Sequence, residues 1–407
     1  MTITLDSSPP PGETGCTVRP RLLLAAVYFT LVGGMGAWGP YLAPFLDRTG
    51  HSGAAIGALL GLIPLARMVS APLWAAVADR FRSGTALLRL GAVLSTLVAA
   101  AIALGSLGPL ALGLALLAFS TLRAPLAPIL DATAVEQLVA QGRDPRGYGL
   151  LRLWGSVGYL LLAGLGALVA ARAEQPGTVL LLGVGAFGLN AALSFALPAV
   201  EGPPPAPILP ALRGLAREPF LLPLLGALVL HGVGLTAYDA LLPMHLAQAD
   251  PGGGWTAAAL SAGVAVEVLV MALGTRLLGR VAPERLLSFS IGVGALRWAL
   301  TAALHAPLAL VLVQTLHGIS FGVFWIAGVE LMRQRAPRTL LSSAQALLVT
   351  ATYGAGSLLS SALTSALLDR AGTAGVFAAS AAASVLATGL ALWAARRLRD
   401  TTARPAA

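Results

Sequence analysis

The sequence predicts an all-α membrane protein whose twelve transmembrane helices form two pseudo-symmetric bundles of six. Hydrophobic residues make up 57% of the 407 residues and charged residues only 11%, whereas a soluble domain carries about 25% charged residues. Apolar stretches of about 20 residues, enough for a helix to cross a bilayer, follow one another along almost the whole chain. Composition and pattern together exclude an ordinary soluble protein.

Residues 1–21 are polar and rich in Pro, and we expect them to form a cytoplasmic tail. They lack the basic start and short apolar core of a cleaved signal peptide. The apolar stretch that begins near Leu22 is too long for such a core, so it predicts an uncleaved first span. The single cysteine, Cys16, leaves no partner for an intramolecular disulfide.

Twelve apolar stretches follow this tail, and the Gly and Pro residues inside them are usual in membrane helices. The predicted spans are 22–46, 54–78, 85–105, 108–140, 148–171, 177–198, 219–247, 255–279, 285–304, 307–332, 339–368 and 373–395. A Pro-rich segment separates the sixth span from the seventh. We therefore predict one bundle over 22–198, a cytoplasmic linker over 199–218, a second bundle over 219–395 and a cytoplasmic tail over 396–407.

The two predicted bundles repeat the placement of polar residues at an offset of about 200. Arg67 in the second span corresponds to Glu267 in the eighth, and Arg80 corresponds to Arg280. Two repeats with a binding site between them near the bilayer midplane are typical of secondary transporters.

The basic residues are all Arg, and their positions indicate the orientation of the chain. The alternate gaps predicted to be cytoplasmic contain Arg19, Arg21, Arg80, Arg82, Arg143, Arg146, Arg213, Arg217, Arg280, Arg285, Arg333, Arg335, Arg338, Arg396, Arg397, Arg399 and Arg404. The opposite gaps contain only Arg48, Arg172 and Arg370. The positive-inside rule then places both termini in the cytoplasm, and we expect a bacterial inner membrane. The net charge of +9 is too dispersed for a nucleic-acid surface, which needs a clustered basic face.

Ionisable residues inside the predicted second bundle point to a coupling site. Glu267, Arg297 and His317 lie near the middle of spans eight, nine and ten, at similar depth for a rise of about 1.5 Å per residue. Asp239 lies somewhat closer to the outside. A charge at mid-membrane costs about 2.5–3.5 kcal/mol, so these groups need a polar interior and partners.

A carboxylate that is ionised beside an Arg and takes up a proton away from it suits proton coupling. His317 could relay the proton or bind substrate. The alternative is a static buried ion pair that orients the helices.

Arg67 and Arg123 lie mid-span in the predicted first bundle with no acidic residue at their depth. Unpaired cations at a cavity would suit an anionic substrate, and packing against backbone carbonyls is the alternative. Trp38, inside GAWGP, is a candidate for the cavity wall because local helix breaks line cavities. Further candidates, although such aromatics more often belong to the core or the interface, are Tyr28, Tyr41 and Trp325.

Several motifs together carry a specific resemblance over about residues 25–395. They are IGALLGLIPLARMVSAPLW (56–74), APILDAT (127–133), YGLLRLWGSVGY (148–159), GVAVEVLVMALGTRL (263–277), ALRWAL (295–300), VQTLHGISFGVFWIAG (313–328) and AQAL (344–347). The chain resembles the major facilitator superfamily, and within it the 3-phenylpropionate permease type. That branch is related to the oligosaccharide–proton symporters of the lactose permease type.

The resemblance implies roles for matching residues. Glu267, Arg297 and His317 would be the acid, Arg and His of the coupling site, and Arg67 a characteristic Arg of the phenylpropionate branch. Implied gating residues and ion pairs are Asp79, Arg80, Asp131 and Arg152, of which Asp131 and Arg152 would pair. The chain departs from the family pattern at three positions. Gly is expected in place of Ala75, His is expected in place of Trp325, and Arg123 is not an expected residue at its position.

The leading hypothesis is a monomeric proton-coupled importer of a small organic anion, such as an aromatic carboxylate, without cofactor or metal. A proton-coupled efflux antiporter and a sugar or nucleoside symporter are the alternatives. GISFG (318–322) matches the G-x-S-x-G pattern of serine hydrolases, which needs a strand–turn–helix elbow, but it falls inside an apolar span. A receptor is disfavoured because no soluble output domain is predicted.

Overall fold

The computed structural model describes residues 19–81, 83–105, 107–170, 172, 175, 177–198, 213–247 and 254–403. Most of the predicted N-terminal tail, residues 199–212 of the predicted linker, and residues 404–407 lie outside these ranges. Within them the chain is helical and contains no strand, as the apolar pattern predicts. Helices satisfy every backbone polar group inside one segment, which a bilayer requires.

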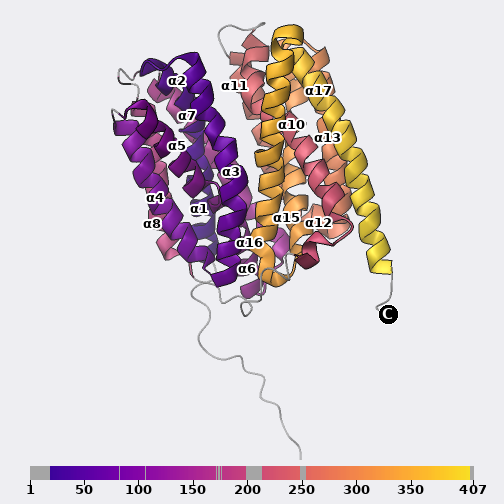
Figure 1. Cartoon of the computed structure of the whole chain (residues 1–407). Coiled ribbons are helices and arrows are strands. Elements are labelled where there is room, and N and C mark those ends of the chain that lie inside the picture. The colour runs from indigo at the N-terminus through magenta and orange to yellow at the C-terminus, as the bar shows by residue number, and fades with distance from the viewer. Residues whose placement is uncertain are drawn as a thin grey trace, which may run out of the picture.

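The first half of the chain forms one group of helices (Figure 1). Its elements are α1 (Arg19–Gly36), α2 (Gly39–Arg48), α3 (Gly53–Phe81), α4 (Gly84–Leu104), α5 (Pro109–Arg123), α6 (Leu126–Ala140), η1 (Pro145–Tyr148), α7 (Gly149–Ala170) and α8 (Thr178–Ala196). Here α1 packs against α7 and α8, and α4 packs against α5 and α8.

The second half forms the other group. Its elements are α10 (Leu221–Ala247), α11 (Gly254–Ala272), α12 (Gly274–Arg280), α13 (Pro283–Ala303), α14 (Pro307–Gln314), η2 (Gly318–Val323), α15 (Phe324–Arg335), η3 (Arg338–Leu340), α16 (Leu341–Val349), η4 (Thr350–Ala355) and α17 (Gly356–Ala403). Both α10 and α13 pack along α17. Pro283 and Pro307 begin α13 and α14, where the missing N–H of Pro costs nothing.

The described residues contain eleven stretches long and apolar enough to cross a membrane. The last, Arg338–Arg399, is 62 residues long and contains both the eleventh and the twelfth predicted span. They are joined at Gly372, whose φ of +61° reverses the chain in a conformation that glycine tolerates best. The prediction of twelve helices in two six-helix bundles is confirmed.

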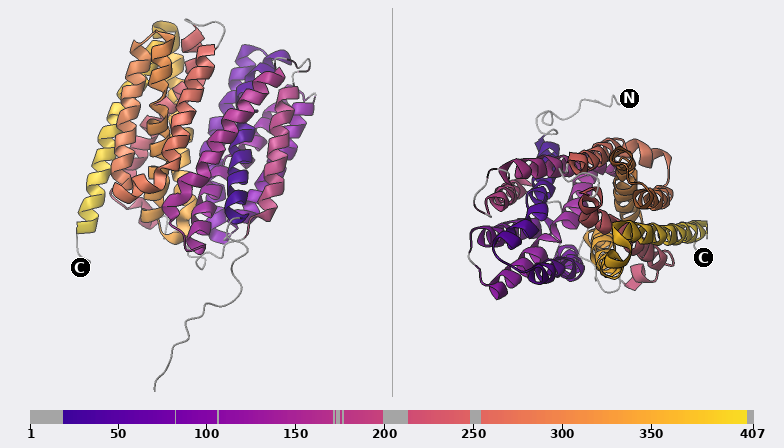
Figure 2. Two further views of the ribbon diagram at one scale, coloured as in Figure 1. Left: turned by 180° about the vertical axis from the view of Figure 1, so that it is seen from behind. Right: turned by 90° about the horizontal axis from the view of Figure 1, so that it is seen from above.

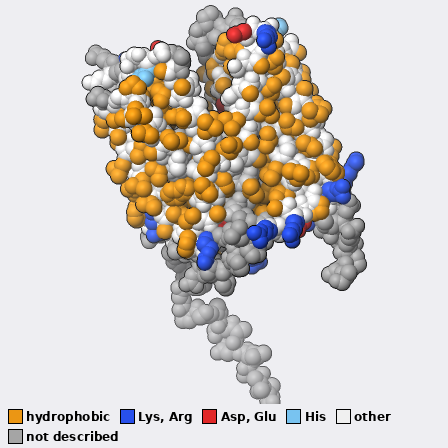
Figure 3. Space-filling view, in the orientation of Figure 1, with side chains coloured by type: hydrophobic (Ala, Val, Ile, Leu, Met, Phe, Trp, Pro, Cys, Tyr) orange, Lys and Arg blue, Asp and Glu red, His pale blue; other side chains and the backbone are white. Residues whose placement is uncertain are grey.

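The two groups of helices meet at one end of the molecule and diverge at the other. We call the end where α1 begins and α17 finishes the termini end, and the opposite end the far end (Figures 1 and 2). Near the termini end, α16 packs against α3 and α6, and α12 packs against η1. The space-filling view shows a hollow between the groups at the far end, apolar flanks, and Arg side chains gathered at the termini end (Figure 3).

Candidate functional site

His317 lies between Glu267 and Arg297 in the middle of the second group. Its Nε2 is 3.1 Å from Oε2 of Glu267, and its Nδ1 is 3.0 Å from Nη1 of Arg297. Relative exposure is 3% for Glu267, 0% for Arg297 and 8% for His317. The structure thus brings together the three residues predicted to share a depth, with Glu267 in contact with His317 and not directly with Arg297.

The hydrogen bonds fix the state of this His317 ring. A guanidinium can only donate, so Nδ1 of His317 accepts from Arg297. A neutral imidazole with an accepting Nδ1 carries its proton on Nε2, which then donates to Glu267. The carboxylate receives a second hydrogen bond from Ser156 on α7, with Oγ 2.5 Å from Oε1. Glu267 therefore links the two groups of helices.

Polar and aromatic neighbours hold Arg297 in place. Nε and Nη2 both donate to Oε1 of Gln314, at 2.9 and 2.7 Å, and Nη1 also donates to Oγ of Ser320 at 3.3 Å. The guanidinium carbon lies 4.1 Å from the ring centre of Tyr238 and 4.3 Å from that of Trp298, a cation–π arrangement. These contacts supply the partners that a buried cation needs.

Glycines allow the helix that carries His317 to reach Glu267. A Cβ on Gly318 would lie 2.5 Å from Cγ1 of Val266 and 2.8 Å from the backbone nitrogen of Glu267. A Cβ on Gly263 would lie 3.1 Å from Cβ of His317. Directly after His317, the chain forms the π-helix η2, a local widening often found at functional sites. Small residues and this widening therefore set the Glu267–His317 contact.

Asp239 and Arg67 face the space between the groups of helices. Asp239, on α10, is exposed although it lies well inside a span, and Arg67, on α3, is half-buried. Asp239 interacts electrostatically with Arg67, Arg297 and Glu267, which lie on three other helices. Such convergence places Asp239 at the central space and not toward lipid.

A second polar cluster lies nearer the termini end. The hydroxyl of Tyr28 donates to Asp131 at 2.7 Å, and Nε1 of Trp325 donates to the hydroxyl of Tyr148 at 3.1 Å. Arg152 interacts electrostatically with Asp131 and lies 5.6 Å from the Trp325 ring centre. The predicted pair of Asp131 and Arg152 thus interacts electrostatically, and Asp131 also accepts hydrogen bonds, among them the one from Tyr28.

Tyr28 and Trp325, the further candidates for the cavity wall, are buried at 1% and 4% exposure. Trp325 belongs to the second group and its partner Tyr148 to the first, so their hydrogen bond joins the two groups. Around the central space three acids, Asp131, Asp239 and Glu267, are matched by three cations. These are Arg67, Arg152 and Arg297.

Arg123 and Trp38 lie inside the first group, which corrects the prediction that they line the central cavity. Nη2 of Arg123 donates to the carbonyl of Leu31 at 2.6 Å, and its guanidinium lies 3.8 Å from the Phe187 ring centre. Trp38 packs on Phe119 and Phe187 at 1% exposure. Arg123 therefore follows the alternative prediction, in which it packs against a backbone carbonyl.

Tyr41 is half-buried, and its hydroxyl donates to the carbonyl of Ala163 at 2.7 Å.

Asp79 joins the groups at the termini end. Its carboxylate accepts from the backbone N–H groups of Ser342 and Ser343, at 3.1 and 2.8 Å, at the start of α16. An anion at a helix N-terminus satisfies unpaired N–H groups and the helix dipole. Arg80 is exposed and lies over the ring of Phe81, so Asp79 is the member of the predicted gating pair that makes the link.

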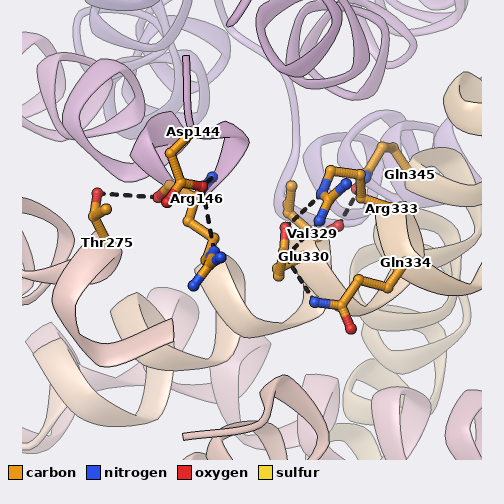
Figure 4. Close-up of polar contacts among 8 residues, drawn as sticks. All are labelled: Asp144, Arg146, Thr275, Val329, Glu330, Arg333, Gln334 and Gln345. Carbon is orange, nitrogen blue, oxygen red and sulfur yellow. Dashed lines mark hydrogen bonds and ion pairs between the residues drawn. The ribbon is translucent and has the colours of Figure 1, made fainter. Parts of the chain in front are cut away.

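Further polar contacts surround this junction (Figure 4). The hydroxyl of Thr275, on α12, donates to the carbonyl of Arg146 in η1 at 3.3 Å. Glu330 forms an ion pair with Arg333 at 2.6 Å. The contact between Thr275 and Arg146 adds a second link between the groups at the termini end.

Sequence reasoning missed Ser156, Tyr238 and Gln314. Gln314 lies one turn before His317, so its spacing placed it on the same helix face, and Tyr238 adjoins Asp239. Ser156 stands in the quoted motif at 148–159 but carries no charge to single it out. Among the described residues, no group of three or more His, Cys, Asp and Glu side chains could hold a metal ion.

Residues 22–379 match the MFS_1 like family. The chain belongs to this family of the major facilitator superfamily. It is 32% identical over 353 residues to the maltose permease of Geobacillus stearothermophilus, covering 84% of this chain and 86% of the relative. It is 29% identical over 326 residues to the probable 3-phenylpropionic acid transporter of Escherichia coli (strain K12), covering 77% and 82%.

Solved transporter structures share the fold. The nucleoside transporter NupG aligns with a TM-score of 0.64 at 18% identity, covering 94% of this chain and 100% of that chain. FucP in the outward conformation aligns with a TM-score of 0.69 at 15% identity, covering 93% and 99%. The chain is therefore a secondary transporter and not an enzyme. Ser320 of the GISFG motif is buried within π-helix η2 and receives a hydrogen bond from Arg297.

Proposed function

We propose that the protein is a monomeric proton-coupled symporter that imports a small organic anion across a bacterial inner membrane. The termini end faces the cytoplasm, as the Arg distribution indicates. The observation that carries the proposal is the chain of contacts from Ser156 through Glu267 and His317 to Arg297.

Proton binding at Glu267 changes this chain of contacts. A proton on Oε2 would face the N–H of His317, so one of these groups must move. A proton on Oε1 would turn the hydroxyl of Ser156 from donor to acceptor. In the second case the altered hydrogen bond is one that joins the two groups of helices, which ties proton occupancy to their relative position.

The charges around the central space favour an anionic substrate once a proton has bound. Neutralising Glu267 leaves the three cations Arg67, Arg152 and Arg297 facing the two acids Asp131 and Asp239. An excess positive charge in a site shielded from water attracts an anion strongly. Arg67 is the best candidate for the direct contact, because it is half-buried at the central space and the structure assigns it no ion pair within the described residues.

The structure fits the outward-facing stage of an alternating-access cycle. The groups of helices are apart at the far end (Figure 3) and linked at the termini end by Asp79 and Thr275. Opening toward the cytoplasm then requires release of the start of α16 from Asp79. Rocking of two repeats about a central site is the usual mode of such transporters.

Proton-coupled uptake of a sugar is the second candidate. Two observations favour it: the relative at 32% identity is a maltose permease, and the unprotonated site is balanced in charge. Asp239 would then accept hydrogen bonds from hydroxyl groups of a neutral substrate, and Arg67 would donate hydrogen bonds to them. The aromatic side chains near His317, such as Tyr238 and Phe321, would suit either kind of ring.

A substrate-induced pH change tests both candidates. Cells that produce the protein are suspended in weak buffer and given aromatic carboxylates, maltose-type sugars or nucleosides. Alkalinisation on addition of an aromatic carboxylate supports the proposal, and alkalinisation by a sugar alone supports the second candidate. Uptake without any pH change, or acidification, would contradict proton symport.

A further inference from the structure

A groove of about 540 Å³ lies between α13 and the final part of α17, away from the central space. Its walls are apolar along most of their length, with Phe289, Leu296 and Leu392 exposed at 58%, 53% and 49%. Arg297 is the one residue of α13 that the proposed transport mechanism uses, and it is buried and does not line the groove. The mechanism uses no residue of the final part of α17.

Three Arg side chains line the termini end of this groove. Arg285 stands in the first turn of α13, and Arg396 and Arg399 stand near the end of α17. All three are exposed. Two acidic residues are neighbours of these Arg residues in the sequence: Glu284, in the first turn of α13, and Asp400, directly after Arg399. The groove therefore has a cationic mouth at the membrane surface and an apolar channel at the depth of the acyl chains.

The corresponding seam of the first group carries a half-buried Arg side chain. There, between α4 and α8, Arg89 donates from Nε to the carbonyl of Ser194 at 3.2 Å and from Nη2 to the carbonyl of Leu197 at 2.7 Å. In the second group Gly292 faces Thr388 across the seam, as Gly188 faces Thr96 in the first. The two seams therefore share a glycine–threonine contact and differ in the Arg side chain that crosses the first.

We propose that this groove binds an anionic phospholipid of the leaflet at the termini end. The headgroup phosphate lies against Arg285, Arg396 and Arg399, and one acyl chain runs along Phe289 and Leu296. Basic pockets between transmembrane helices bind anionic lipid headgroups by charge and hydrogen bonding, and Arg matches phosphate geometry well. A neutral or zwitterionic lipid would fill the same apolar channel without this gain.

Photocrosslinking tests the proposal on the full chain purified in detergent. Phosphatidylglycerol with a photoactivatable group on its acyl chain is compared with phosphatidylcholine that carries the same chain. The expected label falls on peptides from α13 and the end of α17 that contain Phe289–Leu296 and Thr388–Ala395. Phosphatidylglycerol should label them about fivefold or more strongly, the factor that about 1 kcal/mol for even one basic residue would give.

Variants separate headgroup recognition from general surface charge. The triple change Arg285→Gln, Arg396→Gln, Arg399→Gln should lower phosphatidylglycerol labelling to the phosphatidylcholine level. The matched control Arg217→Gln, Arg276→Gln, Arg280→Gln removes three exposed cations elsewhere and should leave the preference intact. Gly292→Leu keeps every Arg but fills the channel, and should reduce labelling by both lipids.

Three results would overturn the proposal. The first is a wild-type label that is spread along the apolar flanks and shows no preference between the two headgroups. This result needs no variant. The control triple variant could lose the preference as fully as the groove variant. The groove variant could retain it while remaining monodisperse.

Discussion

The imidazole of His317 donates to the carboxylate of Glu267 across 3.1 Å while its other nitrogen accepts from Arg297. The ring therefore separates an acid from the cation that would otherwise pair with it. Movement of His317 by the length of one hydrogen bond would change the surroundings of both charges. The coupling proposed for this protein therefore depends on a contact of three residues and not on a simple ion pair.

Replacement of Glu267 by Gln should abolish uphill transport. The amide keeps the shape of the side chain but has no carboxylate to protonate, so an imposed proton gradient can no longer drive accumulation. In vesicles with an imposed gradient, internal and external substrate should become equal, while exchange of substrate for substrate continues. Glu284→Gln, which removes a carboxylate in the first turn of α13, is the control and should accumulate substrate as wild type does. Accumulation by the Glu267 variant would refute the coupling role.

Replacement of Gly318 by Ala should destabilise the protein and impair coupling. The new Cβ would lie 2.5 Å from Val266 and 2.8 Å from the backbone of Glu267, so α11 and η2 must separate. Overpacking of this kind costs about 1–3 kcal/mol, and thermal unfolding of the purified protein should show it as a lower Tm. Gly164→Ala, where nothing lies within 4 Å of the added atom, should leave Tm and uptake nearly unchanged. An unaltered Tm for the Gly318 variant would contradict the packing argument.

Loss of charge should affect KM at Arg67 but not at Arg123. Arg67→Gln removes the cation at the central space and should raise KM for an anionic substrate about tenfold, the equivalent of about 1.4 kcal/mol. Arg123→Met keeps length and apolar contact with Phe187 and should leave KM unchanged, because Arg123 lies inside the first group of helices. Initial uptake rates over a range of substrate concentrations give both values. Equal losses in the two variants would return Arg123 to the substrate site.

Asp79→Asn should favour opening at the termini end. The variant loses the charge that stabilises the start of α16 across the junction, where helix capping contributes about 0.5–2 kcal/mol. Spin labels at the exposed positions Phe81 and Arg338, in a Cys16→Ser background, report the distance between the two groups of helices. The distance is measured by pulsed electron paramagnetic resonance. A longer-distance population should grow in the variant. An unchanged distance distribution would show that Asp79 does not hold this end closed.

The sequence predicted the fold because length and apolarity alone define membrane helices. It also predicted that Glu267, Arg297 and His317 share a depth, since helical rise converts residue number into height. It did not predict which way each helix faces. Residues that contact lipid and residues that pack inside a bundle are both apolar, so the pattern around Arg123 and Trp38 was the same for a cavity wall and for a bundle interior. The place of His317 between the two charges depends on π-helix η2 and on Gly318, and neither has a distinctive local pattern.

The equal number of acids and cations around the central space has a consequence for the energetics of the proposed transport cycle. An empty, unprotonated carrier has no net charge at this site to move through a low-dielectric interior when it reorients. The free-energy barrier to its return is therefore low. A carrier with a bound proton and no anion would have to enclose an unbalanced cation, which is costly. In the proposed symport this difference would limit proton leak, because the proton would cross readily only together with the substrate.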